Sequence, residues 1–141
     1  MPESGAMTMR PVAARLISAG AVLMLLAVIL GAFGAHALQN VLAPKMLAAY
    51  QTAVSYHLFH ALGVLAVGLV AQVTPPSSWI ARAGVLLVVG VALFSGSIYS
   101  LALGAPRAIG VITPFGGVSF MAGWLCVALH VRAVRAETGP D

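Results

Sequence analysis

Charge is what this sequence lacks most. Of its 141 residues only three are acidic and seven are basic, so charged residues make up 7% of the chain. Soluble domains have roughly 25%. Apolar residues make up 61% of the chain, and the mean hydropathy is +1.04. So few charges cannot cover the surface of a water-soluble domain, so we expect lipid to be the main solvent of this chain.

Acidic residues and cysteine are the scarcest reactive groups. The acidic residues stand only near the ends of the chain, at Glu3, Glu137 and Asp141. No carboxylate is therefore placed to orient a histidine as in a Ser-His-Asp triad. The single cysteine, Cys126, excludes an intramolecular disulfide framework and a CxxC motif. We expect a protein that is not an enzyme and has no metal centre, and the residues name no cofactor.

The basic residues are scattered singly beside apolar segments. The net charge is +4, but no basic patch forms, which excludes nucleic acid as a partner. With four spans, the termini and the middle connector share one side of the membrane. That side holds Arg10, Arg15, Arg82, Arg132 and Arg135, and the other side holds Lys45 and Arg107. Five basic residues against two predict cytoplasmic termini.

Four long apolar runs dominate the chain. They predict helices at about 15–36, 44–73, 78–103 and 113–133, within one transmembrane domain over 1–141. About 20 helical residues cross a hydrocarbon core of about 30 Å. Helices are expected because a lipid-exposed backbone must satisfy its own hydrogen bonds. The fold class predicted is all-α, an integral membrane four-helix bundle.

The connectors carry helix-start signals. Ser78 follows a proline-rich turn and is expected to cap the third helix, and Thr113-Pro114 reads as the cap and first-turn proline of the fourth. The first run ends with Ala35-His36-Ala37, which resembles a signal-peptide cleavage site. The run is long for a signal peptide, so we expect a retained helix. Cleavage is the alternative, and would leave three helices.

Uncharged polar side chains gather in the half of the membrane away from the termini. At about 100° per residue, one wedge of about 120° on the second helix contains Tyr50, Ala53, Tyr56, His57 and His60. Polar groups inside membranes usually face the bundle interior or water. We therefore expect one site or one packing core there. Its candidate members are His36, Tyr50, His57, His60, Ser95, Tyr99 and Thr113.

Several interpretations of this polar cluster remain open. Its side chains could join neighbouring helices by hydrogen bonds, as polar residues do in lipid. The Tyr50, His57 and His60 group could instead bind a quinone, a lipid or another small molecule, since histidine and tyrosine donors suit a carbonyl headgroup. Ion binding or transport is a further alternative, weakened because no acidic residue lies in any span. Metal or haem ligation lacks a carboxylate or thiolate to complete the ligand set.

Small residues recur every four positions on the first and third helices. Such stripes let helix backbones approach closely. We expect them to pack helices of this chain together, with a partner protein or a homo-oligomer as the alternative. The residues assigned to helix packing are Gly31, Gly34, Gly96, Ser100 and Gly104.

Four sequence blocks resemble those of a known family. They are 31–38 (GAFGAHAL), 50–62 (YQTAVSYHLFHAL), 94–99 (FSGSIY) and 113–117 (TPFGG). Together they resemble the YgdD/YwdK domain-of-unknown-function family of small bacterial membrane proteins, which includes the eukaryotic transmembrane protein 256. The resemblance implies a four-helix protein of the bacterial plasma (inner) membrane. It implies no activity, substrate or cofactor.

The functional hypothesis follows from the small extramembrane mass, the small-residue stripes and the missing catalytic acids. We expect a non-enzymatic accessory or scaffold subunit of a larger membrane complex, with a respiratory complex as the candidate. Its partners are then the lipid bilayer and that complex, and a homo-oligomer stays open. The alternative is a membrane-embedded protein that binds or transports a small molecule or ion through Tyr50, His57 and His60.

Overall fold

The computed structural model describes residues 8–139, and all the regular structure in that range is helical. Four α-helices are long and apolar enough to cross a membrane. They are α1 (Pro11–His36), α2 (Pro44–Val73), α3 (Ser78–Ala102) and α4 (Thr113–Thr138), with a short 3₁₀ helix, η1 (Arg107–Ile112), before α4. The protein is therefore an all-α integral membrane four-helix bundle.

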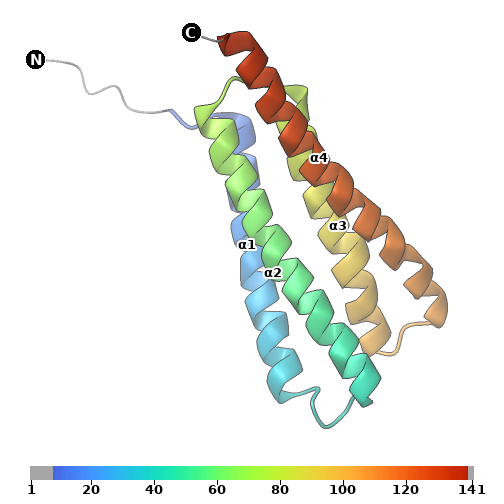
Figure 1. Ribbon diagram of the computed structural model, residues 1–141. Coiled ribbons are helices and arrows are strands. Elements are labelled where there is room, and N and C mark those ends of the chain that lie inside the picture. The colour runs from blue at the N-terminus through green and yellow to red at the C-terminus, as the bar shows by residue number, and fades with distance from the viewer. Residues whose placement is uncertain (1–7, 140–141) are drawn as a thin grey trace, which may run out of the picture.

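The helices pack mainly in chain order, α1 on α2, α2 on α3 and α3 on α4, with smaller contacts between α1 and α3 and between α2 and α4. Figure 1 shows the α1–α2 pair beside the α3–α4 pair, with the start of α1 and the end of α4 at the same end of the bundle. The start of α1, the 74–77 connector and the end of α4 lie together, and we name this the terminal end. The 37–43 and 103–112 connectors lie at the opposite, far end (Figure 1).

The observed helices differ from the expected ones mainly where polar residues flank the apolar runs. The α2 bounds are those expected, whereas α1 begins at Pro11 rather than near residue 15, and α4 continues to Thr138 rather than ending near 133. Proline suits the first helical position because its missing N–H would be unpaired there anyway. The backbone N–H of Ala14 bonds to the Arg10 carbonyl at 2.9 Å, which closes the first turn of α1. Both α1 and α4 thus extend beyond the apolar runs from which they were predicted.

Two expected caps are corrected by the structure. Ser77, and not Ser78, caps α3, because its hydroxyl accepts the Ile80 N–H at 3.3 Å. Thr113 caps nothing, since η1 runs directly into α4. Its hydroxyl instead shares a 2.7 Å hydrogen bond with Ser97 of α3. A polar side chain near a helix start can find a better partner on a neighbouring helix.

Glycines bring neighbouring helices into backbone contact. A Cβ atom at Gly20 would lie 2.8 Å from the Leu65 backbone nitrogen, and one at Gly68 would lie 2.9 Å from that of Ile17. A Cβ atom at Gly116 would collide with the Phe94 backbone. The first two positions join α1 to α2, and the third joins α3 to α4. Close approach of this kind is how helices associate in lipid, which supplies no hydrophobic drive.

Candidate functional site

A first polar cluster joins α1, α2 and α3 in the far half of the molecule. The Tyr50 hydroxyl donates to the Leu30 carbonyl at 2.8 Å, and the Tyr50 and Tyr99 rings lie 5.0 Å apart. Nδ1 of His57 lies 3.3 Å from the Tyr99 hydroxyl. All three rings are buried, and Tyr50 is only 1% exposed. The Tyr50, His57 and Tyr99 cluster therefore has the character of a helix-joining core.

The far side of the His57 ring is unsatisfied. Its Nε2 is buried and has no hydrogen-bond partner among residues 8–139. The Leu23 carbonyl of α1 interacts with this ring electrostatically without completing a hydrogen bond. Nearby, the Ser95 hydroxyl donates to the Ala53 carbonyl at 2.9 Å and pins α3 to α2. Ser95 is thus a structural tie within the same half of the molecule.

His60 belongs to a second cluster, on the side of α2 that faces α4. Its ring stacks on Phe120, with centroids 3.5 Å apart, and lies 6.2 Å from the Trp124 ring. Tyr56 stacks on Phe94 of α3 with centroids 4.7 Å apart. The structure therefore separates His60 from Tyr50 and His57, which the sequence grouped in one wedge.

The hydrogen bond of His60 fixes which nitrogen carries the proton. Nδ1 lies 2.7 Å from the Tyr56 carbonyl oxygen. A carbonyl can only accept, so Nδ1 must donate, and in the neutral ring Nε2 is then an acceptor. His60 is 9% exposed, and Nε2 has no partner in the described part of the chain, yet it is not sealed inside the protein. It therefore presents a free lone pair.

His60 also lines a groove of about 360 Å³ whose walls come from α2, α3 and α4. We call it the aromatic groove. Tyr56, at one edge, is 42% exposed, contrary to the expectation that the whole wedge would avoid lipid. The groove is lined by Tyr56, His60, Phe94, Pro114, Gly117, Val118, Phe120, Met121 and Trp124.

Two of the predicted site residues lie outside both clusters. His36 is the last residue of α1 and is exposed at the far end. Thr113 begins α4 and bonds only to Ser97. The predicted set of seven is thus divided: Tyr50, His57, Ser95 and Tyr99 lie together, and His60, His36 and Thr113 each lie elsewhere.

The predicted packing glycines also divide. Gly34 packs under the Tyr50 ring, and a Cβ atom at Gly31 would lie 3.3 Å from Val54. Gly96 is open, because a Cβ atom there would meet only the Val91 carbonyl, at 4.0 Å. Gly104 has a positive φ of 92° and lies past the end of α3, so it shapes the turn there and packs no helix. The Ser100 hydroxyl bonds back to the carbonyl of Gly96, at 2.8 Å.

A third polar cluster, at the terminal end, was not predicted. His130 of α4 is 0% exposed, and its Nε2 and Nδ1 lie 2.9 Å from the Thr74 hydroxyl and 2.7 Å from the Ser77 hydroxyl. Thr74 donates to the Val70 carbonyl at 2.8 Å, so its oxygen accepts from Nε2–H and Nδ1 accepts from Ser77. Its only sequence signal was hydroxyl residues in the middle connector and a histidine at the same depth.

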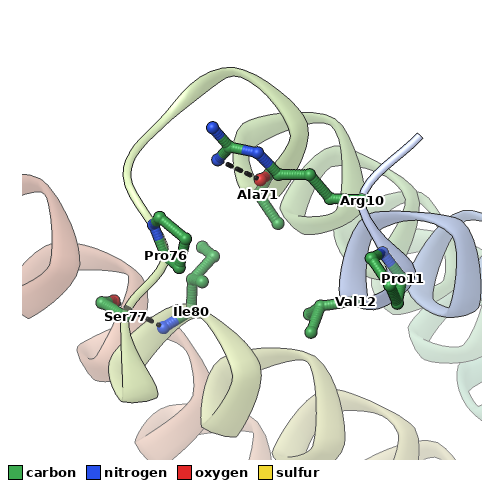
Figure 2. A pocket seen from close by; sticks show the side chains of 7 residues that line it. All are labelled: Arg10, Pro11, Val12, Ala71, Pro76, Ser77 and Ile80. Atoms are coloured by element: carbon green, nitrogen blue, oxygen red, sulfur yellow. Dashed lines mark hydrogen bonds between the residues drawn. The ribbon is translucent and has the colours of Figure 1, made fainter. Parts of the chain in front are cut away.

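The terminal end also carries a mainly apolar groove of about 350 Å³, shown in Figure 2. Arg10 stands at its rim and donates through Nη1 to the Ala71 carbonyl, at 3.3 Å, and to the Thr74 carbonyl. The backbone N–H of Arg10 donates to the side-chain oxygen of Gln72 at 2.9 Å. Figure 2 shows Val12 and Ile80 facing one another across the groove. These contacts tie the start of α1 to the end of α2.

The chemistry that these clusters offer is hydrogen bonding. Within residues 8–139, no group of three or more histidine, cysteine or acidic residues is placed to hold a metal ion. His60 and Tyr56 are the polar side chains that line the aromatic groove, beside the rings of Phe94, Phe120 and Trp124. The molecule is thus, by fold and site, a small multi-pass membrane protein with polar helix junctions and an aromatic groove between α2, α3 and α4.

Comparison with known proteins gives the family. A family model described as "Protein of unknown function (DUF423)" matches residues 30–117. The chain is 42% identical over 116 residues to the UPF0382 membrane protein YwdK of Bacillus subtilis, covering 82% of this chain and 93% of that one. It is 42% identical over 110 residues to the UPF0382 inner membrane protein YgdD of Escherichia coli, covering 78% and 82%. The chain belongs to this family of membrane proteins, as its sequence blocks predicted.

A third relative is the UPF0382 membrane protein SSP2132 of Staphylococcus saprophyticus, 45% identical over 111 residues, covering 78% of this chain and 90% of that one. None of these three names carries an activity. No solved structure matches the chain.

Proposed function

We propose that this protein is a non-enzymatic accessory or scaffold subunit of a larger membrane complex. The observation that carries the proposal is the open face of α3 formed by Ala92, Gly96 and Ser100, which we call the α3 face. Ala92 is exposed, and the position of a Cβ atom at Gly96 is free of neighbouring helices. Elsewhere in this chain, close-packed glycines receive another helix. A bare small-residue face is suited to a helix from another protein.

The distribution of mass supports the same function. Among the described residues, only short connectors at 37–43, 74–77 and 103–106 and the η1 helix join the four helices. Large apolar side chains on the same side of α3 are exposed, with Val85 59% and Val89 39% accessible. Helix faces are therefore the main surface through which this chain can meet a partner. A respiratory complex is the partner we propose to test first.

The orientation is part of the proposal. Five arginines flank the terminal end of the spans, and Lys45 and Arg107 flank the far end. Basic residues are retained on the cytoplasmic side of inner-membrane proteins. We therefore infer that the terminal end faces the cytoplasm and that the aromatic groove lies in the half of the membrane facing away from it.

Two leucine substitutions test the accessory function. Gly96→Leu fills the α3 face, whereas Gly117→Leu, also at a position without close neighbours, lies on α4 beside the aromatic groove. Purification in mild detergent should recover the partner polypeptides with the wild type and Gly117→Leu but lose at least nine-tenths of them with Gly96→Leu. Both variants should keep the wild-type unfolding temperature. Equal recovery of partners with Gly96→Leu would contradict the proposal.

A further inference from the structure

We propose that the aromatic groove binds a hydroquinone carried on an apolar tail, whose ring hydroxyl donates to Nε2 of His60. This inference is independent of the accessory function, because the groove lies between α2, α3 and α4 and none of Ala92, Gly96 and Ser100 of the α3 face lines it. It concerns binding only.

The hydrogen-bond acceptor for this ligand is a ring nitrogen of His60. His60 is about nine-tenths buried, and its Nδ1–H is committed to the Tyr56 carbonyl at 2.7 Å. Nε2 is left as an acceptor with no partner in the described part of the chain. An acceptor that meets hydrocarbon instead of water loses its hydrogen bonds to water, which costs free energy. The group that would satisfy it must bring a hydrogen to donate.

The position of His60 near the middle of α2 restricts the chemistry of the donor further. His60 stands within two residues of the middle of the 30-residue α2. At about 1.5 Å per residue it lies about 24 Å along the helix from Pro44 and about 20 Å from Val73. A phospholipid headgroup would have to desolvate its charge to reach that depth, which is expensive in hydrocarbon. The donor is therefore an uncharged hydroxyl on a molecule that dissolves in the bilayer.

The walls of the groove favour a flat ring. Tyr56 and Phe94 stack with their planes 26° apart, and the Trp124 ring lies 6.2 Å from that of His60. Aromatic rings pair well in offset or edge-to-face geometries at such walls. The groove volume of about 360 Å³ is large enough for a small ligand. An aromatic alcohol thus fits these contacts better than an aliphatic one.

A hydroquinone and its quinone differ at the atom that matters here. The hydroquinone hydroxyl can donate to Nε2 of His60, whereas a quinone carbonyl can only accept. The two forms have nearly the same shape and apolar area, so the aromatic walls do not distinguish them. The structure therefore predicts tighter binding of the reduced form, by about three- to ten-fold for one hydrogen bond.

Trp124 supplies the measurement. The chain has two tryptophans, and Trp79→Phe leaves Trp124, whose ring lies 6.2 Å from that of His60, as the single tryptophan of this chain, with empty nanodiscs as the blank. Decyl-benzohydroquinone and decyl-benzoquinone are titrated without oxygen into this variant in phospholipid nanodiscs. The hydroquinone should give a saturable change in Trp124 fluorescence at a lower concentration than the quinone. Phospholipid is in excess throughout, so a saturable change excludes it as the preferred occupant.

Three further variants complete the test. His60→Phe keeps the stacking on Phe120 but removes the acceptor, and should abolish the preference for the hydroquinone. Gly117→Leu should block binding of both forms, because no neighbour lies within 4 Å to resist the leucine, which then fills the groove. His36→Phe, at the exposed end of α1, should bind like the parent. Equal affinity for both forms, a preference that survives in His60→Phe, or a response that never saturates would overturn the proposal.

Discussion

At the scale of single residues, three histidines of this chain occupy three different environments. His57 is buried between helices with an unpartnered Nε2. His60 bonds through Nδ1 to the Tyr56 carbonyl of its own helix, and the residue lines the aromatic groove. His130 is fully buried with both nitrogens bonded to hydroxyls. Identical side chains therefore occupy a helix junction, a groove wall and a satisfied hydrogen-bond network.

The sequence could predict the depth of these histidines but not their direction. His57 and His60 differ by about 60° around α2, which is a small angle on a helical wheel. Here the boundary between two neighbouring helices passes through that angle, so one ring meets Tyr99 and the other meets Phe120. The positions of α1, α3 and α4 around α2 decide this, and they depend on packing over the whole chain.

His130→Leu should destabilise the protein by about 2 kcal/mol. The substitution removes two hydrogen bonds, of 2.9 and 2.7 Å, and leaves the Thr74 and Ser77 hydroxyls with one partner fewer at a partly buried site. The free energy of unfolding, measured by titrating denaturing detergent into mixed micelles, tests this. His36→Leu is the control and should change it by less than about 0.5 kcal/mol, because His36 is exposed. Equal effects of the two substitutions would show that the His130 cluster does not stabilise the fold.

At the scale of helices, the presence of each helix was easier to predict from the sequence than the residues at which it begins and ends. Each run of about 20 apolar residues is found as a helix, because no other structure satisfies the backbone in lipid. The ends depend on local partners that a single sequence does not reveal. Ser77 rather than Ser78 caps α3, and Thr113 bonds to Ser97 instead of capping α4.

Adjacent glycines of α4 allow a matched test of the α3–α4 contact. A Cβ atom at Gly116 would collide with the Phe94 backbone, which cannot rotate away as a side chain could. Gly116→Ala should therefore cost about 1–3 kcal/mol of stability. Gly117→Ala has no neighbour within 4 Å and should be neutral or stabilising by up to about 1 kcal/mol. Thermal unfolding followed by circular dichroism in detergent compares them, and the reverse order would refute this account of the contact.

At the scale of the whole molecule, the arrangement of the four helices around one another could not be predicted from the sequence. Four apolar helices can pack in more than one arrangement, and the hydropathy of the sequence is the same in each. The helix packing seen here leaves one side of α3 uncovered around Gly96. The small-residue repeat was visible in the sequence, but only the structure separates Gly34, which packs on Tyr50, from Gly96, which packs on nothing.

The proposed orientation of the bundle in the membrane gives a prediction for the whole molecule. In a Cys126→Ser background, Pro75→Cys lies on the exposed connector at the terminal end and Gln39→Cys on the exposed connector at the far end. A membrane-impermeant maleimide added to intact cells should label Gln39→Cys, whose connector we place outside the cytoplasm, and not Pro75→Cys. Labelling of Pro75→Cys alone would invert the proposed topology.

The central claim is that this protein acts as a part of a larger membrane assembly. Native mass spectrometry of the protein, released with its own lipids from its own membrane, tests that claim most directly. We predict a defined hetero-assembly whose mass exceeds that of the 14.4 kDa chain and which Gly96→Leu dissolves. A bare monomer, or a homo-oligomer that Gly96→Leu leaves intact, would contradict the claim.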